Sequence, residues 1–310
     1  MDAVETPSPH VEVDARPAGP ADLRRLALTN DGHVTTMQVR AGRVRGLALH
    51  LRRLDQANQE LYGTGLDPDL LRDRIRHALA TTPTPTPAPT TPANAATATA
   101  TQGPERRGDA TVRVVVFPGA NGAVHVLVSV GAPAEPAVTP LRLSSLCAPR
   151  PFPHLKHVGT FGQLHSARLA RRRGFDDALL VTADGLVCET TVANIGFLTT
   201  GDRTGDAAGD AAGGAAGGAA GENVAGPATV IWPQAPMLTG VTMTLLDERL
   251  PGCRREPVPL AGLGRFQAAF VANGRGLAPV GRIDTTTFPA APAAVAALAQ
   301  VYAAVPWDEI

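Results

Sequence analysis

The chain has 310 residues, of which 44% are hydrophobic and 4% aromatic, so it is long enough for two compact domains with cores built mainly from Ala, Val and Leu. Its 28 basic residues balance its 28 acidic residues, which argues against a protein that binds nucleic acid or an anionic membrane. The sequence has no signal-peptide pattern, no apolar run long enough to span a membrane and no CxxC pair. We therefore expect a cytoplasmic protein without a membrane span, a disulfide scaffold or a bound metal.

Two segments lack the apolar residues that a core needs. Residues 81–110 and 201–229 consist almost wholly of Thr, Pro, Ala, Gly and Asp, so burying them could not offset their chain entropy. We expect both to be mobile insertions, and the acidic, proline-rich residues 1–20 to form a disordered tail. The rest of the sequence predicts an N-terminal α/β domain over 21–148 and a C-terminal domain over 149–310.

The first of these domains combines strands with two helices. Alternating or continuous apolar residues predict strands at 34–39, 44–49, 112–117 and 124–130. Apolar residues spaced for one helical face predict a helix from His50 to Leu61. Asp67 followed by Pro68 is typical of the start of a second helix. The pattern predicts an α/β sandwich with mostly antiparallel strands.

The second domain mixes helices and strands along its whole length. Its patterns predict helices at 163–173, 241–250 and in the Ala-rich stretch 289–305. They predict strands at 178–182, 186–188, 194–198, 230–232 and 267–272. Asp184 and Gly185, between the first two strands, are typical of a type I′ hairpin turn.

The basic residues are 27 arginines and one lysine, Lys156. Arginine can replace lysine wherever a positive charge suffices. It cannot do so where an amine must lose its proton and attack a carbonyl, because guanidinium stays charged. Lys156 is therefore a candidate Schiff-base residue. The alternative is a surface lysine retained by chance.

A carboxylate follows Lys156 after 33 residues, because Glu189 ends the second strand of the hairpin. An amine and a carboxylate that converge on one pocket are what pyridoxal phosphate requires. The amine forms a Schiff base, and the carboxylate holds the pyridine nitrogen protonated. From spacing alone, an ordinary glutamate at the end of a strand remains an alternative.

Residues 189–195, ETTVANI, resemble the signature of the class IV aminotransferases, the fold-type IV pyridoxal phosphate enzymes. That family includes branched-chain and D-amino acid aminotransferases and 4-amino-4-deoxychorismate lyase. The resemblance implies a two-domain homodimer, with a smaller N-terminal α/β sandwich and a larger C-terminal α/β pseudo-barrel. It also implies that pyridoxal phosphate lies between the domains, with Lys156 as the Schiff-base lysine and Glu189 as the partner of the pyridine nitrogen. Asn194 belongs to the same signature and is expected at the cofactor.

Three further segments resemble the parts of the family that bind the cofactor phosphate. Residues 50–54, HLRRL, resemble an H-x-x-R-L element and imply that Arg53 binds the phosphate. Residues 238–242, LTGVT, resemble L-P-G-I-T and imply that the amides of Val241 and Thr242 and the threonine hydroxyl do so at the start of a helix.

The third segment, residues 270–274, resembles the last phosphate-side loop, with Asn273 where Thr or Ser is usual.

Departures from the family pattern leave the substrate open. Phe161 stands where branched-chain enzymes have tyrosine, and Met243 stands where arginine is common. Thr36 lies in a segment closer to aminodeoxychorismate lyase. Arg113 lies where some relatives bind a substrate carboxylate, although a structural ion pair is an equal alternative. Thr36, Arg113 and Phe161 are thus the candidate substrate residues.

The leading interpretation is a pyridoxal-phosphate-dependent aminotransferase that acts on an amino acid and a keto acid. The alternatives are a lyase similar to aminodeoxychorismate lyase and a non-catalytic relative.

Overall fold

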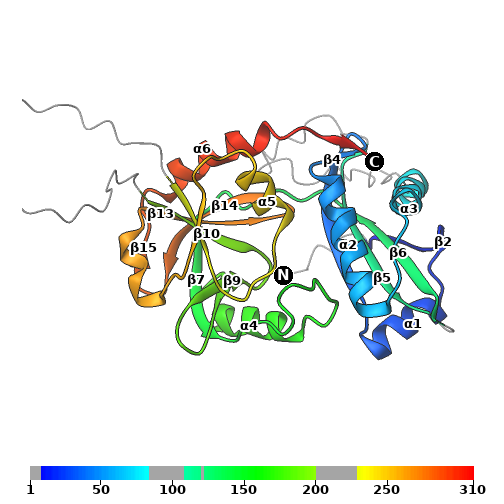
Figure 1. Cartoon of the computed structure of the whole chain (residues 1–310), viewed down its shortest axis with the longest axis horizontal. Helices are drawn as coiled ribbons and strands as arrows, with labels where there is room; N and C mark the ends of the chain where they lie inside the picture. Colours follow the sequence, from blue (N-terminus) through cyan, green and yellow to red (C-terminus); the bar gives the residue numbers. More distant parts are fainter. Residues whose placement is uncertain (1–7, 84–107, 120–121, 200–228) are drawn as a thin grey trace, which may run out of the picture.

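The computed structural model describes residues 8–83, 108–119, 122–199 and 229–310. Most of both expected insertions, 81–110 and 201–229, lies outside these ranges, as does the start of the expected tail. The described chain forms two α/β halves side by side, each built around its own sheet (Figure 1). This arrangement confirms the α/β fold with two domains.

The N-terminal half contains a seven-stranded sheet in the order β16-β4-β3-β5-β6-β1-β2, in which all neighbouring strands are antiparallel. Its strands are β1 (His10–Val13), β2 (Arg16–Pro17), β3 (His33–Arg40), β4 (Arg43–Val44), β5 (Ala110–Pro118), β6 (Val124–Gly131) and β16 (Asp308–Glu309). Helices α2 (Leu47–Tyr62) and α3 (Pro68–Thr81) cover one face over an aliphatic core. Helix α1 (Pro20–Thr29) contacts a smaller apolar cluster on the other face.

Local sequence explains where the two covering helices begin. Gly46 has a φ of 68°, a left-handed conformation that favours glycine and turns the chain from β4 into α2. Helix α2 therefore begins before the predicted His50, and the predicted strand 44–49 shortens to β4. Asp67 accepts a hydrogen bond from the amide of Asp69 at 2.9 Å and caps α3, as the sequence predicts.

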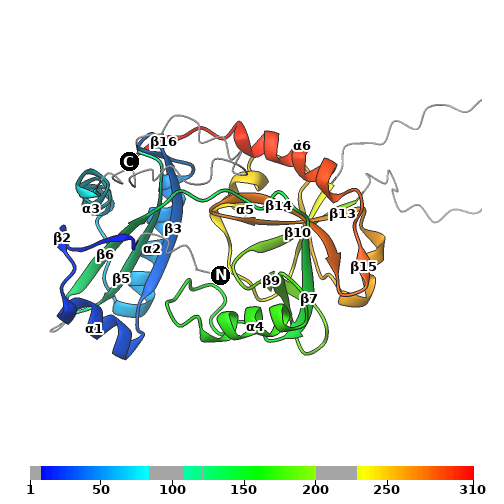
Figure 2. The same ribbon diagram turned by 180° about the vertical axis from the view of Figure 1, so that it is seen from behind.

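The C-terminal half contains a nine-stranded sheet in the order β12-β11-β10-β13-β14-β7-β8-β9, with β15 paired to β14. The strands are β7 (Leu141–Cys147), β8 (Asp177–Val181), β9 (Val187–Thr190), β10 (Asn194–Thr199), β11 (Thr229–Pro233), β12 (Arg254–Glu256), β13 (Ala268–Asn273), β14 (Gly276–Ile283) and β15 (Thr286–Thr287). The helices are α4 (Phe161–Arg172), α5 (Val241–Asp247) and α6 (Ala291–Ala303). The sheet curls around a core that includes Phe197 and Trp232, with α6 packed on β14 and α4 on β8 (Figure 2).

Two boundaries predicted from the sequence are wrong. Residues 10–13 of the expected disordered tail form β1, which pairs with β6, because Val13 is fully buried and adds to the sheet core. The expected domain boundary at 148 is too late, because β7 pairs with β14 and β8 and so belongs to the C-terminal sheet. Composition and local pattern do not show which distant strand a segment will pair with.

The hairpin of β8 and β9 forms where it is predicted, but its turn has another type. A type I′ turn needs positive φ at both central residues. Here Gly185, with a φ of 79°, is the only residue of the turn in that region. Its amide donates to the carbonyl oxygen of Thr182 at 3.0 Å, so a type I turn precedes a left-handed glycine.

The C-terminal segment returns to the N-terminal half (Figure 1). Strand β16 pairs with β4, and Ile310 is buried in the core beneath α2 and α3. The carboxylate of Asp308 accepts a hydrogen bond from the amide of Leu47, the first residue of α2, at 2.8 Å. The guanidinium of Arg45 lies 4.2 Å from the ring centroid of Trp307. Helix α2 is therefore held in place by the end of the chain.

We expect Asp308→Ala to lower the free energy of unfolding by about 1 kcal/mol, the usual effect of losing a helix cap. The amide of Leu47 loses its carboxylate acceptor in this variant. Glu309→Ala is the matched control, because that carboxylate pairs with the exposed Arg43 and contributes about 0.5 kcal/mol or less. Denaturant unfolding of both variants measures the difference. Equal losses would contradict the capping role.

Candidate functional site

Lys156 lies in the segment between β7 and α4, at the junction of the two halves. Prolines at 149, 151 and 153 restrict the approach to it, which turns at Phe152, where φ is 47° and the carbonyl oxygen accepts from the amide of Leu155 at 3.0 Å. The amide of Val34, on β3, donates to the carbonyl oxygen of Lys156 at 2.7 Å, and the amide of Val158 donates to the carbonyl oxygen of Gly32 at 2.9 Å. The lysine backbone is thus attached to the edge of the N-terminal sheet.

The surroundings of Lys156 favour its neutral amine. Burial, together with the positive charges of Arg53 and Arg150, lowers the pKa of Lys156 to about 7. The negative charge of Glu189 opposes this decrease and does not cancel it. An amine with this pKa has lost its proton in about half of the molecules at neutral pH, so it can act as a nucleophile.

Glu189 lies on β9, whose four residues are all buried. One carboxylate oxygen faces the guanidinium of Arg150 at 3.5 Å, and the other accepts a hydrogen bond from the amide of Leu238 at 3.4 Å. Burial raises the pKa of Glu189, while Arg150, the Leu238 amide and Lys156 oppose that increase. The structure therefore brings the predicted lysine and glutamate into one charged cluster.

Arg53 and His50 lie one turn apart on α2 and face Thr35 of β3. The Arg53 guanidinium donates to the Thr35 hydroxyl, and that oxygen lies 2.7 Å from Nδ1 of His50. Burial and the neighbouring Arg150 lower the pKa of Arg53 to about 10, and burial holds the pKa of His50 well below its usual value. Nε of Arg53 is buried and has no hydrogen-bond partner in the described part of the chain. Such a donor is available to an anion.

The start of α5 lies beside the loop that follows β13. Gly240 is the extended N-cap residue, so the amides of Val241 and Thr242 have no partner within the helix. The hydroxyl of Thr242 donates to the carbonyl oxygen of Asn273 at 2.6 Å. The side-chain oxygen of Asn273 accepts from the amide of Arg275 at 2.9 Å, so it stabilises its own turn.

Asn194, the first residue of β10, contacts the loop that precedes α5. Its side-chain amide donates to the carbonyl oxygen of Leu238 at 2.6 Å. A Cβ atom at Gly240 would lie 2.1 Å from the side-chain oxygen of Asn194, so only glycine fits there. Asn194 therefore positions the loop before α5, and its role toward the cofactor stays a prediction.

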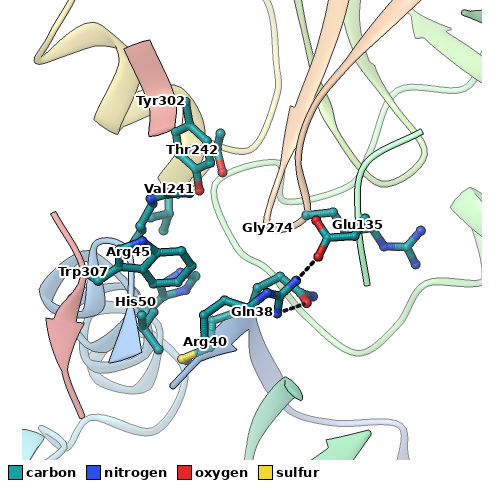
Figure 3. Close-up of a pocket in the computed structure, with 13 residues that line it drawn as sticks. Gln38, Arg40, Arg45, His50, Glu135, Val241, Thr242, Gly274, Tyr302 and Trp307 are labelled. Carbon is teal, nitrogen blue, oxygen red and sulfur yellow. Dashed lines mark hydrogen bonds and ion pairs between the residues drawn. The ribbon is translucent and has the colours of Figure 1, made fainter. Parts of the chain in front are cut away.

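A cavity of about 220 Å³ lies next to the start of α5. Val241, Thr242 and Gly274 line it from the C-terminal half, and Arg45 and His50 line it from the N-terminal half (Figure 3). Lys156 and Glu189 are not among its lining residues. It is therefore a separate space from the one that holds the amine and carboxylate.

The family model for class IV aminotransferases matches residues 32–283, which include most strands of both sheets and every site residue described above. The chain belongs to the class IV aminotransferase family. A search of curated protein sequences finds no significant match.

Several solved structures share the fold of this class IV aminotransferase. A hypothetical aminotransferase from Mycobacterium tuberculosis, in a pyridoxal-phosphate-bound form, is 18% identical with a TM-score of 0.68, covering 95% of this chain and 98% of that chain. A fold IV transaminase from Curtobacterium pusillum is 20% identical with a TM-score of 0.65, covering 90% and 88%. A branched-chain aminotransferase from Thermoproteus uzoniensis, with norvaline, is 15% identical with a TM-score of 0.66, covering 96% and 94%. At these identities the likeness shows the fold alone.

The candidate substrate residues of this class IV aminotransferase do not all lie together. Thr36 and Arg113 are directly opposite each other on β3 and β5, so their side chains share a face, and the charge of Arg113 contributes to lowering the pKa of Lys156. Phe161 is different, because its side chain is 72% exposed at the start of α4 and stacks on His165. The role of Phe161 toward a substrate therefore stays a prediction, on a side chain that this chain leaves exposed.

Arg150 is the residue that sequence reasoning missed. It carries a buried charge that faces Glu189 and lowers the pKa of Lys156, yet it matches none of the motifs used above. The available signal was an arginine within a run of prolines, six residues before the only lysine. Thr35 was also missed, because the neighbouring Thr36 was chosen, whereas the strand alternation turns Thr35 toward Arg53.

A metal site and a membrane-spanning helix are two other features that the structure could contain. Within the described ranges, no group of three or more His, Cys, Asp or Glu side chains could hold a metal ion. Among the helices of the same ranges, none is long and apolar enough to cross a membrane.

Proposed function

We propose that this class IV aminotransferase uses pyridoxal phosphate, bound as a Schiff base to Lys156, to move an amino group between an amino acid and a keto acid. One observation carries the proposal: the single lysine of the chain lies in one charged cluster with the buried Glu189, and its pKa is lowered to about 7. The hypothetical aminotransferase from Mycobacterium tuberculosis has a pyridoxal-phosphate-bound form, and a branched-chain aminotransferase of the same fold binds pyridoxamine 5′-phosphate, which supports the same cofactor here.

The residues around Lys156 fit a phosphorylated aldehyde. Arg53 offers a buried Nε atom without a partner in the described chain, and the first-turn amides of Val241 and Thr242 are free of helix partners. Guanidinium and helix-terminal amides are the donors that a phosphate prefers. Glu189 is the carboxylate that would face the ring nitrogen.

When bound, pyridoxal phosphate draws electrons away from the α-carbon of an amino acid and makes the proton there removable. The chain's own residues would supply the remaining functions. Lys156 would hold the cofactor and, once released as a free amine, accept the α-proton and return it at a neighbouring carbon. Glu189 would keep the ring nitrogen protonated. Arg113, beside Thr36, would hold the substrate carboxylate.

Borohydride reduction of the cofactor-loaded protein tests the Schiff base. Because Lys156 is the only lysine, we expect a pyridoxyl group on one peptide, the one that contains Lys156. Peptide mass spectrometry after digestion measures the position. A label on the N-terminus alone, or no label, would contradict the assignment.

Amino transfer, rather than a lyase reaction on the same cofactor, has its own test. We expect single amino acids to convert bound pyridoxal phosphate to the pyridoxamine form, and continued turnover to require an added keto acid. Absorbance of the cofactor with and without the keto acid measures this. Continued product formation without any keto acid would instead support a lyase similar to aminodeoxychorismate lyase.

We also propose that the protein is a homodimer and that it works in the cytoplasm, as the family resemblance implies. Phe161 and Leu164, one turn apart on α4, are 72% and 50% exposed, and large exposed apolar side chains often mark a protein interface. Light scattering after size-exclusion chromatography should give twice the chain mass of 32.0 kDa. A mass of one chain at working concentration would exclude the dimer.

A further inference from the structure

Arg150 lies beside Glu189, and its charge is close enough to Lys156 to lower the pKa of that amine. Strand β7 ends at Cys147, and Arg150 follows it with a proline on either side. The side chains of Arg150 and Glu189 are 7% and 6% exposed, and their charged atoms lie 3.5 Å apart. A buried pair of this kind matters because removing one partner leaves the other charge uncompensated.

Two cations face Glu189, and they differ in one respect. Arg150 keeps its charge under all physiological conditions. Lys156 does not, because its pKa is about 7 and because its nitrogen is covalently engaged whenever a Schiff base forms. Burial by itself favours the neutral form of Glu189. Arg150 is therefore the constant charge that opposes protonation of this carboxylate.

The Arg150 guanidinium is also incompletely satisfied by the protein. Its Nε atom is buried and has no hydrogen-bond partner among the described residues, and the same is true of Nε of Arg53. The 3.5 Å contact with Glu189 is long for a charge-assisted hydrogen bond. Arg150 is thus buried with a hydrogen-bond donor that the described protein does not satisfy. This is expected for a group that gains a further contact when a ligand binds.

We propose that Arg150 is a positioning residue whose fixed charge keeps Glu189 ionised and directed at the ring nitrogen of the cofactor while Lys156 changes its own charge. This inference rests on the proposed function, because it assigns Arg150 a role toward pyridoxal phosphate. Arg150 acts through Glu189 and does not itself exchange a proton.

The ring nitrogen offers a direct measurement. With pyridoxal phosphate labelled with ¹⁵N in the ring, we expect the wild-type protein to show a protonated nitrogen, since Glu189 is ionised. In Arg150→Gln the proton should move toward Glu189, so the ¹⁵N signal should shift toward that of the unprotonated ring. Arg282→Gln is the matched control, because Arg282 also has a buried, unpartnered Nε but lies over the ring of Phe175. Its signal should remain that of the wild type.

The cofactor-free protein gives a second measurement. Reductive methylation with ¹³C-formaldehyde labels Lys156 as the only lysine, and its NMR signal reports its titration. Removing the positive charge of Arg150 should raise the midpoint of that titration by about one pH unit or more, whereas Arg282→Gln should leave it unchanged. A merely structural role for Arg150 would not produce this selective shift.

A variant with a titratable side chain covers the case in which Arg150→Gln does not fold. In Arg150→His the charge is present at low pH and lost between about pH 5 and 8. The ring-nitrogen signal should then change from protonated to unprotonated over that range.

Failure of the proposed function and failure of the role of Arg150 give different results. A wild-type protein that binds no pyridoxal phosphate overturns the proposed function. A wild-type protein with a protonated ring nitrogen, and Arg150 variants with the same signal at every pH, overturn the role of Arg150 alone.

Discussion

Replacement of Lys156 by arginine is expected to lower turnover by about 10³-fold or more, the scale of loss seen when a nucleophilic residue is removed from an active site. The substitution keeps a positive charge at nearly the same place. It removes the only side-chain amine in the chain that can lose its proton, because guanidinium stays charged. Single-turnover conversion of the cofactor by an amino acid measures the effect, with bound cofactor quantified separately.

Control variants distinguish the contribution of the Lys156 amine from that of its positive charge. In Lys156→Ala, the cofactor should still bind through Arg53 and the amides at the start of α5, and a small added amine such as methylamine should restore part of the lost rate. Full activity in Lys156→Arg would contradict the Schiff-base assignment outright. Full activity in Lys156→Ala without added amine would do the same.

The pH dependence of cofactor capture follows from the same lysine. Only the neutral amine attacks the aldehyde, so the rate at which cofactor-free protein captures pyridoxal phosphate should rise as the pH increases through about 7, where the lowered pKa of Lys156 lies. A lysine with the ordinary pKa of 10.5 would show its midpoint more than three units higher. Stopped-flow absorbance from pH 5 to 9 distinguishes the two cases.

Glu189→Gln is expected to reduce turnover by about 10²–10³-fold while cofactor binding persists. The glutamine side chain keeps the size and a hydrogen-bonding amide. It loses the negative charge that holds the ring nitrogen protonated as charge develops on the substrate. It also leaves the buried Arg150 without its counter-charge, which commonly costs about 3–5 kcal/mol of folding stability. Denaturant unfolding must therefore accompany the kinetic measurement.

Two further variants show whether the loss of turnover in Glu189→Gln comes from the charge and position of this carboxylate. Glu189→Asp keeps the charge but withdraws it by one methylene, so its turnover should also fall, with a smaller loss of stability. Glu256→Gln is the matched control, because that carboxylate lies on β12 of the same sheet and pairs with the exposed Arg265. If Glu189→Gln converts substrate at the wild-type rate with full cofactor occupancy, the carboxylate has no role toward the ring nitrogen.

Several features of the site could be predicted from local sequence, because each depends on residues close together in the chain. The sole lysine is a property of composition, and the hairpin that carries Glu189 follows from alternating residues around Asp184 and Gly185. Residue chemistry made Lys156 and Glu189 candidates, and the resemblance of residues 50–54 to the family's H-x-x-R-L element selected Arg53.

Other features escaped prediction because they depend on contacts between distant segments. Residues 10–13 become β1 only by pairing with β6, more than a hundred residues later. Arg150 gains its significance from Glu189, which arrives beside it on a different strand. Phe161 matches the expected sequence position, yet the helix orientation leaves its side chain exposed.

The sequence by itself determined the chemistry available to this protein: an arginine on a helix, a single lysine and a carboxylate on a hairpin, within segments that resemble the class IV aminotransferases. The tertiary structure decided how these groups act on one another. Burial of Lys156, together with the positive charges of Arg53 and Arg150 near its side chain, lowers the pKa of the amine to about 7. Local sequence cannot encode that shift, because desolvation and charge proximity arise only when the two halves come together.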